Sequence, residues 1–184
     1  MRKLVVSEWM TLDGVFDAKT MDQWFQPYQS DERAEYIKDG VMGSDIFLLG
    51  RITYDRLAPF WSHAQNNEMG IADKMNSMAK YVVSSAPLKV AWQNTTRLQG
   101  NIVEAISKLK DQPGQDIRIT GSATLVRSLM PTGLIDEYRF LVHPILMGSG
   151  KRFFQDEGGI STFKLLRTET FSKGVVLLCY QPGK

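Results

Sequence analysis

Short apolar runs recur along the chain and are separated by segments with helical periodicity. Val, Ile, Leu and aromatic residues fill these runs, which predict strands at residues 4–10, 46–49, 81–84, 117–120, 137–142, 163–171 and 175–180. Apolar side chains spaced three or four apart predict helices over residues 31–41, 54–61, 101–110 and 122–130. Strands that alternate with helices favour a largely parallel sheet with helices on both faces.

The last third of the chain changes character. The runs at residues 163–171 and 175–180 are separated only by Ser172-Lys173-Gly174, a break typical of a hairpin. An antiparallel hairpin therefore finishes the sheet at one edge. The 184 residues suit one domain, so we expect a single three-layer α/β/α domain over residues 1–184.

Three predicted strands end in residues that suit an anionic ligand. The junctions are Gly50-Arg51-Ile52-Thr53, Ser84-Ser85 and Thr120-Gly121-Ser122. Glycine lets the backbone approach a ligand, the free N–H groups of a helix start attract anions, and Arg51 adds a permanent cation. Because ligands of open α/β sheets bind outside the carboxyl ends of the strands, the junctions predict a long anionic ligand lying across the sheet.

Each junction also has a purely structural interpretation. Ser122 and Thr53 suit the N-cap position of a helix, and Arg51 suits a surface loop. Ser84-Ser85 equally suits a turn ahead of a proline. The three junctions together favour ligand binding more than any one of them alone.

Composition narrows the classes of function. The 22 Lys and Arg and the 20 Asp and Glu are mixed along the chain, so a nucleic-acid partner is not indicated. The single cysteine, Cys179, excludes an intrachain disulfide and a multi-cysteine metal site, and His63 and His143 show no metal-ligand spacing. No run suits a signal peptide or a membrane span, so we expect a cytoplasmic protein with no membrane partner.

The sequence resembles the dihydrofolate-reductase-like superfamily. Gly50-Arg51-Ile52-Thr53-Tyr54 is similar to the Gly-Arg-x-Thr-Trp/Tyr element of dihydrofolate reductases. Ser84-Ser85 resembles the Ser-Ser that follows their next strand, and Thr120-Gly121-Ser122 occupies the place of their triple-glycine loop.

Within that superfamily the chain is nearest the reductase domain of bacterial riboflavin biosynthesis, the RibD C-terminal domain. The similar elements are Ser7…Leu12-Asp13-Gly14, Gly121-Ser122-x-x-Leu125, Gly133-Leu134-Ile135-Asp136-Glu137 and Pro144-x-Leu146-x-Gly148-x-Gly150…Phe153. Their order and spacing extend the resemblance over nearly the whole chain.

The resemblance implies a dihydrofolate-reductase-like fold, bound NADPH, and hydride transfer to a small heterocyclic or sugar-derived substrate, as in 5-amino-6-(5-phosphoribosylamino)uracil reductase. The residues implied for the cofactor are Gly50, Arg51, Thr53, Ser84, Ser85, Gly121, Ser122, Ala123 and Thr124. Asp13 and Gly14 are expected beside the nicotinamide and the substrate. Asp13 is the candidate catalytic acid, although Asp-Gly is also a common turn pair.

Two further expectations concern the substrate and the assembly. Trp24, in a segment expected to be a loop over residues 21–28, is a candidate substrate contact. The segment 134–146 carries apolar groups on both alternating sets, which favours cover by a second subunit, and the resemblance also implies a homodimer.

Two departures from the family patterns leave alternatives open. Dihydrofolate reductases hold the pterin with an acid on their first long helix, for which this chain offers Asp31, Glu32 and Glu35. The Thr-Gly-Ser loop has one glycine in place of three. A dihydrofolate or pterin reductase, and a non-catalytic nucleotide- or pterin-binding protein, are the alternative functions.

Overall fold

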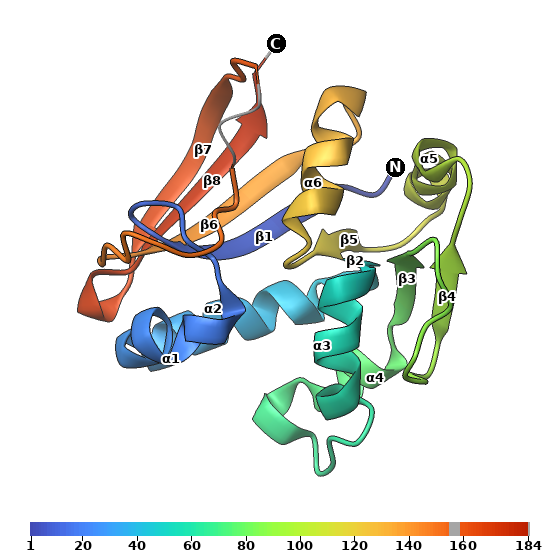
Figure 1. Cartoon of the computed structure of the whole chain (residues 1–184), viewed down its shortest axis with the longest axis horizontal. Coiled ribbons are helices and arrows are strands. Elements are labelled where there is room, and N and C mark those ends of the chain that lie inside the picture. The colour runs from blue at the N-terminus through green and yellow to red at the C-terminus, as the bar shows by residue number, and fades with distance from the viewer. Residues whose placement is uncertain (155–158, 184) are drawn as a thin grey trace.

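A computed structural model describes residues 1–154 and 159–183 as one eight-stranded sheet flanked by helices (Figure 1). The strands are β1 (Leu4–Thr11), β2 (Ser44–Gly50), β3 (Ala79–Val83), β4 (Thr95–Leu98), β5 (Asp116–Ile119), β6 (Glu137–His143), β7 (Phe163–Thr170) and β8 (Val176–Pro182). The helices are α1 (Met21–Trp24), α2 (Asp31–Met42), α3 (Arg51–Trp61), α4 (Ala72–Ser77), α5 (Ile102–Asp111) and α6 (Ala123–Leu129).

The strand order is β4-β3-β2-β5-β1-β6-β8-β7. Every pairing from β4 to β6 is parallel, and β8 pairs antiparallel with both β6 and β7. The mostly parallel sheet and its antiparallel C-terminal hairpin are therefore confirmed. The carboxyl ends of β3, β2, β5 and β1, which are neighbours in the sheet, lie along one edge.

Helices cover both faces of the sheet, as the alternation of patterns predicts. Apolar side chains of α5 and α6 pack on Leu4, Val6 and their neighbours on one face. The other face is covered by α3 and α4 over β2 and β3, and by α2 over β6 and β8. Side chains that alternate along a strand therefore enter two different cores.

Several local expectations were wrong. Strand β4 and helix α4 were not predicted, and residues 21–28 form α1 and a 3-10 turn rather than a loop. Helix α3 begins at Arg51, so Gly50 is its N-cap and Thr53 lies in its first turn. Ser122 precedes α6 but makes no side-chain cap, because its hydroxyl binds elsewhere.

Strand β6 does not need a partner subunit for cover, which corrects the reason given for a dimer. Tyr138 and Phe140 belong to the core beneath α6, and Leu141 packs on the opposite face with side chains of α2. The expected cover from a second subunit is supplied by α2 of the same chain.

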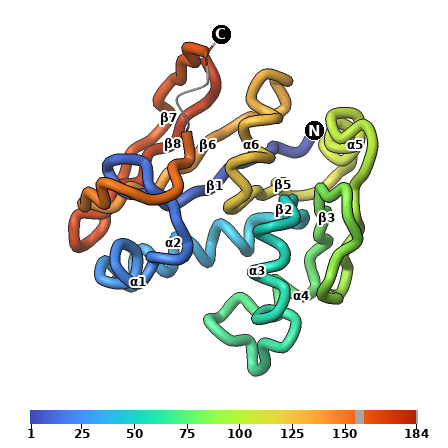
Figure 2. Tube along the Cα trace, viewed as in Figure 1, coloured from blue at the N-terminus to red at the C-terminus, as the bar shows by residue number. Residues whose placement is uncertain are grey.

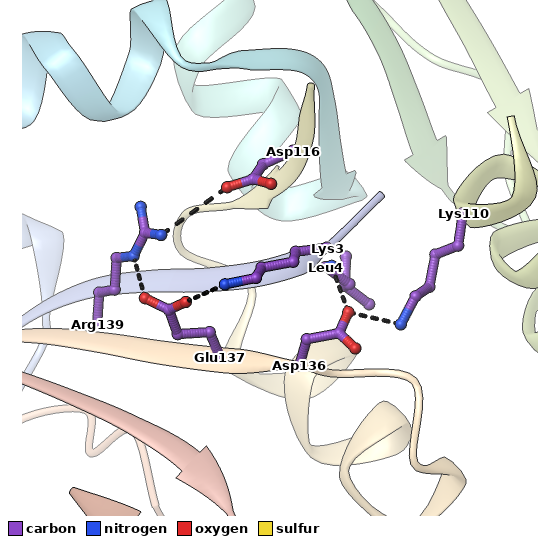
Figure 3. A network of polar contacts seen from close by, with 7 residues as sticks. All are labelled: Lys3, Leu4, Lys110, Asp116, Asp136, Glu137 and Arg139. Atoms are coloured by element: carbon purple, nitrogen blue, oxygen red, sulfur yellow. Dashed lines mark hydrogen bonds and ion pairs between the residues drawn. The ribbon is translucent and has the colours of Figure 1, made fainter. Parts of the chain in front are cut away.

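The amino ends of the central strands carry a network of ion pairs (Figure 3). Lys3 and Arg139 bind Glu137 at 3.3 and 2.7 Å, and Arg139 also pairs with Asp116 at 3.8 Å. Asp136 accepts from the Leu4 backbone N–H at 2.7 Å and from Lys110 at 2.6 Å. Asp136 and Glu137 of the sequence motif thus hold strand ends together, at the edge opposite the three glycine- and serine-containing junctions.

Candidate functional site

A cavity of about 680 Å³ lies at the carboxyl ends of β3, β2, β5 and β1. The nine residues predicted for a cofactor all line it: Gly50, Arg51, Thr53, Ser84, Ser85, Gly121, Ser122, Ala123 and Thr124. Their convergence follows from the strand order, because the three junctions that carry them leave adjacent strands. The lining is mixed, with apolar side chains such as Trp9, Phe16 and Leu57 beside the polar loops.

Ser122 ties two of the junctions together. Its hydroxyl donates to Thr53 Oγ1 at 2.7 Å and accepts from the Gly50 N–H at 2.8 Å. A Cβ on Gly50 would lie only 3.0 Å from the Ser122 hydroxyl oxygen, so a larger residue there would crowd this hydrogen bond. The two loops therefore present one continuous surface to the cavity.

The Gly121-Ser122 loop has an uncommon backbone. Gly121 has φ of +70°, and a Cβ there would meet the Thr53 side chain at 2.9 Å. Ser122 also has a left-handed conformation, with φ of 65°. The left-handed conformation raises the conformational energy of a serine by about 1–2 kcal/mol. The loop therefore keeps a shape that a glycine would adopt with less strain.

Ser84 and Ser85 differ in what their side chains can offer a ligand. The buried Ser84 hydroxyl donates to the Ala86 carbonyl at 2.6 Å and accepts from the Ala86 N–H at 3.2 Å, so it shapes the turn after β3. Ser85 lies exposed in the same turn and lines the cavity.

Positive side chains outnumber negative ones around the cavity. Lys19, Arg51, Arg56 and Lys151 line it, together with the carboxyls of Glu8 and Asp17. Arg51 also pairs with Asp55 at 2.7 Å, one turn along α3. The helix starts with no side-chain cap within the described part of the chain, which leaves its first N–H groups for a ligand. This arrangement suits an anionic ligand.

The resemblance implied a place beside the nicotinamide and the substrate for Asp13 and Gly14, and neither is among the described residues that line the cavity. The Asp13 carboxylate accepts from the Gly148 N–H at 2.8 Å, the Met147 N–H at 3.2 Å and the Thr11 hydroxyl at 2.5 Å. The Thr11 hydrogen bond, with those from the two backbone amides, lowers the pKa of Asp13 from 3.8 to about 2. An acid that stays ionised and fully bonded is a loop clamp rather than a proton donor.

Two motifs of the resemblance meet at this clamp. The loop after β1 and residues 145–153 run side by side (Figure 2), joined by the Phe153 N–H to the Gly14 carbonyl at 3.0 Å. Arg152 pairs with Asp13 at 3.8 Å. The clamp fixes the start of the segment that carries Phe16, Asp17 and Lys19 into the cavity wall.

Trp24 lines the cavity, as expected, but from helix α1. Its indole N–H donates to the Asp17 carbonyl at 3.1 Å, and its ring packs edge-on against His143. His143 is fully buried, donates from Nδ1 to the Met10 carbonyl at 3.1 Å, and accepts from Arg33 at Nε2 at 2.9 Å. Burial lowers the pKa of His143 from 6.5 to about 4, so the ring is neutral.

The acids of the first long helix lie elsewhere. Asp31, Glu32 and Glu35 are absent from the described cavity lining. Glu32 accepts from the Ser172 hydroxyl and N–H at 2.6 and 2.9 Å, and Glu35 pairs with Lys38 at 3.1 Å. An acid corresponding to the pterin-binding one is therefore not offered to the cavity by these three residues.

Glu8 is the acid that the sequence reasoning missed. It lies on β1, lines the cavity, and is only 3% exposed. Its Oε1 has no hydrogen-bond partner among the described residues. The available signal was a glutamate within the apolar run of a parallel strand, where charged residues are rare.

The sheet opens beside Glu8. Strands β1 and β5 pair only as far as Val6 and Ile119, whereas β1 continues beside β6 to Thr11. The β5 side of β1 is therefore free from Ser7 onward, and the alternating side chains of Glu8 and Trp9 enter the cavity from the two faces of the strand. A ligand can reach both faces at this opening.

Comparison with known proteins identifies the family of the chain. A family model described as the RibD C-terminal domain matches residues 2–177. The chain belongs to this family. YyaP of Bacillus subtilis (strain 168) is 30% identical over 181 residues, which cover 97% of this chain and 94% of that protein.

Solved structures confirm the dihydrofolate-reductase-like fold of this RibD C-terminal domain. A putative riboflavin biosynthesis protein from Shewanella sp. PV-4 superposes with a TM-score of 0.74 at 18% identity, over 99% of both chains. Dihydrofolate reductase from Enterococcus faecalis, complexed with NADP(H), gives a TM-score of 0.66 at 13% identity, over 98% of this chain and 97% of that one. The chain and these two proteins share one fold.

The described residues form neither a membrane-spanning helix nor a cluster of metal ligands. No helix there is both long enough and apolar enough to cross a bilayer. Three or more His, Cys, Asp or Glu side chains do not gather in a metal-binding arrangement in the same part of the chain.

Proposed function

We propose that the protein is an NADPH-dependent reductase that transfers a hydride to a C=N or C=O carbon of a small heterocyclic or sugar-derived substrate. The observation that carries this proposal is the single cavity that runs along the carboxyl ends of four neighbouring strands and joins all three anion-suited junctions. The sequence family and the fold support it.

The dimensions and chemistry of the cavity fit a dinucleotide phosphate. Neighbouring strands lie about 4.8 Å apart, so the edge from β3 to β1 spans about 14 Å, and the cavity that runs along it suits an elongated ligand. Arg51 and Ser85 stand at the end that suits the 2′-phosphate, and Gly121 to Thr124 stand beneath the pyrophosphate. Glu8, whose Oε1 has no hydrogen-bond partner in the described chain, and the opening between β1 and β5 lie at the end that suits the nicotinamide.

The rest of the cavity offers a wall for a flat substrate. Trp9, Phe16, Met21 and Trp24 line the cavity, as do Lys19 and Lys151. Aromatic walls with a few cations suit a heterocycle that carries an anionic group, as 5-amino-6-(5-phosphoribosylamino)uracil does. The protein contributes orientation of the two rings and exclusion of water.

The non-catalytic alternative rested on the lost glycines of the Thr120-Gly121-Ser122 loop. Ser122 takes a left-handed conformation and Gly121 is retained where a Cβ would clash. The loop thus keeps an open shape without three glycines, which favours a working cofactor site over a vestigial one.

Fluorescence titration with NADPH tests the cofactor, and loss of nicotinamide absorbance with a panel of pyrimidine, pterin and sugar-derived substrates tests turnover. We expect saturable binding to the wild type, weaker binding to Arg51→Ala, and unchanged binding to Lys164→Ala, which removes an exposed cation of β7. Equal binding to all three proteins would contradict the assigned site. Binding without turnover of any substrate would favour the non-catalytic alternative.

We also propose a homodimer, formed through β7 rather than β6. Strand β7 is the antiparallel edge of the sheet, and its Leu165 and Leu166 are each 48% exposed. An edge strand with exposed leucines can pair with a second copy of itself. Light scattering should give twice 20.8 kDa for the wild type and a monomer for Leu166→Lys; a monomeric wild type would contradict the proposal.

A further inference from the structure

Glu8 is a buried acid that cofactor binding alone leaves unexplained. It is 3% exposed on the side of β1 that carries Leu4, Val6 and Met10, yet it lines the cavity. Its Oε1 has no hydrogen-bond partner within residues 1–154 and 159–183. Burying a polar group without a partner costs about 1–3 kcal/mol, so its presence beside a cavity points to a partner that arrives with the ligand.

The position of Glu8 divides the cavity into two halves. On one side lie the loops after β2, β3 and β5, which suit the phosphates. On the other side, Trp24 packs against His143 at the end of β6, and Trp9 and Phe16 complete the wall proposed for the substrate. Glu8 and Gly121 line the same cavity, so the acid shares it with the loop proposed for the pyrophosphate. The reacting ring and the substrate would meet at this boundary.

The surroundings of Glu8 favour its neutral form. Burial raises the pKa of Glu8 well above 4.5, and this outweighs the lowering by Arg118 and by the Gly121 N–H. Arg118 is the charged group that acts on Glu8 from β5, but its guanidinium lies across the sheet, where it donates to Ser7 at 2.9 Å and Thr120 at 3.1 Å. The other charged side chains that line the cavity are Asp17, Lys19, Arg51, Arg56 and Lys151.

We propose that Glu8 is the acid that supplies the proton of the reduction, the role that the sequence suggested for Asp13. The inference rests on the proposed function. As the substrate carbon takes the hydride from NADPH, the C=N or C=O π bond breaks and its heteroatom takes the O–H proton of Glu8. The carboxylate that remains lies beside the oxidised, positively charged nicotinamide, and water returns the proton afterwards.

The proposed role of Glu8 can be tested without a substrate, because the two forms of the cofactor should affect its proton differently. The nicotinamide ring of NADP⁺ carries a positive charge, whereas the ring of NADPH is neutral. A carboxylate at Glu8 attracts the charged ring, so NADP⁺ binding should drive the proton off Glu8 and NADPH binding should not. Both ligands carry the same phosphates, so their ionisation cancels when the two are compared.

The test is calorimetric titration with NADP⁺ and with NADPH, in buffers of different ionisation enthalpy, between about pH 5 and 8. In the wild type we expect NADP⁺ to release up to one more proton than NADPH. Its affinity relative to NADPH should rise with pH, by up to about tenfold per unit, until the pKa of Glu8 is passed. Glu8→Gln keeps the shape and cannot ionise, so both differences should vanish.

Glu137→Gln is the matched control. Glu137 is also buried, but it lies at the amino end of β6, on the edge of the sheet opposite the cavity. Glu137→Gln should behave as the wild type in both titrations. Equal proton release and equal pH dependence in the wild type and Glu8→Gln, with circular dichroism showing both folded, would overturn the role of Glu8 and leave the cofactor site standing. Failure of the wild type to bind either ligand would overturn the proposed function, and this inference with it.

Discussion

Two buried glutamates at opposite ends of the same sheet have opposite surroundings. Glu137, 8% exposed at the amino end, is bound by Lys3 and Arg139. Burial acts to raise the pKa of Glu137, but these partners outweigh it and hold the pKa below its ordinary value. Glu8, 3% exposed near the carboxyl end, keeps an oxygen without a partner in the described chain, and burial raises its pKa. Identical side chains with similar burial therefore have different uses.

The difference extends to the backbone of the two ends. At the amino end, Asp136 and Lys110 satisfy one another and the Leu4 N–H (Figure 3). At the carboxyl end, Ser122 is held in a left-handed conformation beside a cavity. Unsatisfied and strained groups persist only where the surrounding structure supports them, and they gather at functional sites. The amino end stabilises the fold, and the carboxyl end is available for a ligand.

The largest expected effect is on stability, from breaking the amino end. Lys110→Met removes the buried ammonium that binds Asp136 and the Leu134 carbonyl, both at 2.6 Å. Breaking a buried ion pair costs about 3–4 kcal/mol of unfolding free energy. Denaturant unfolding should show this loss, while NADPH affinity stays unchanged. A change in NADPH affinity with little change in stability would erase the distinction between the two ends.

A pH-dependent loss of stability is expected from the carboxyl end of β6. The pKa of His143 lies below that of the unfolded chain, so the unfolded state takes up a proton first as the pH falls. The free energy of unfolding should therefore be highest above pH 6.5 and decrease by about 3 kcal/mol as the pH falls toward 4. Unfolding at several pH values should show this loss in the wild type and in His63→Gln, which changes an exposed histidine. The loss should be missing in His143→Gln, and its persistence there would assign it to another group.

At the carboxyl end we expect a substitution that weakens cofactor binding and leaves the free energy of unfolding unchanged. Arg51→Ala removes a half-exposed cation of the cavity wall. Loss of charge-assisted hydrogen bonds should weaken NADPH by about 1.5–3 kcal/mol, and NADH much less, because NADH lacks the 2′-phosphate. Fluorescence titration measures both affinities. Equal losses for the two cofactors would remove Arg51 from the 2′-phosphate site.

The smallest expected effect is a difference in stability between two variants of Ser122, which separates backbone strain from the loss of hydrogen bonds. Ser122→Ala loses the hydrogen bonds to Thr53 and Gly50 and keeps the left-handed conformation, whereas Ser122→Gly loses the same bonds and relieves the strain. Ser122→Gly should therefore be about 1 kcal/mol more stable than Ser122→Ala in denaturant unfolding. Equal stabilities would mean that the loop is not strained.

The sequence was sufficient to predict those helices and strands that follow a regular hydrophobic pattern. Apolar runs located seven of the strands. Five of these are parallel strands of the sheet interior, which read as nearly continuous apolar runs, and the antiparallel β7 and β8 were marked by the short break between them. The hydrophobic pattern missed β4, whose Thr95–Leu98 is half-polar at the sheet edge, and α4, which has only six residues. The sequence could predict which residues line the cavity, because each of the nine proposed for the cofactor follows a strand end and parallel strands bring those ends together.

The acid of the site could not be found by the same reasoning. Asp13 sits in a motif, but its partners Met147 and Gly148 lie more than a hundred residues away in sequence, and only the fold shows that they use its carboxylate. Glu8 sits in no motif that we identified. Its importance depends on the point at which β5 ends beside β1, and that is a property of strand register.

The central claim is that the cavity at the carboxyl end holds NADPH. The most direct measurement is a crystal structure of the protein with NADPH. We expect the cofactor to run along the edge of the sheet, with its 2′-phosphate near Arg51, its pyrophosphate beside Gly121 and its nicotinamide beside Glu8. A cofactor bound at another surface, or in this cavity with its nicotinamide away from Glu8, would contradict the account.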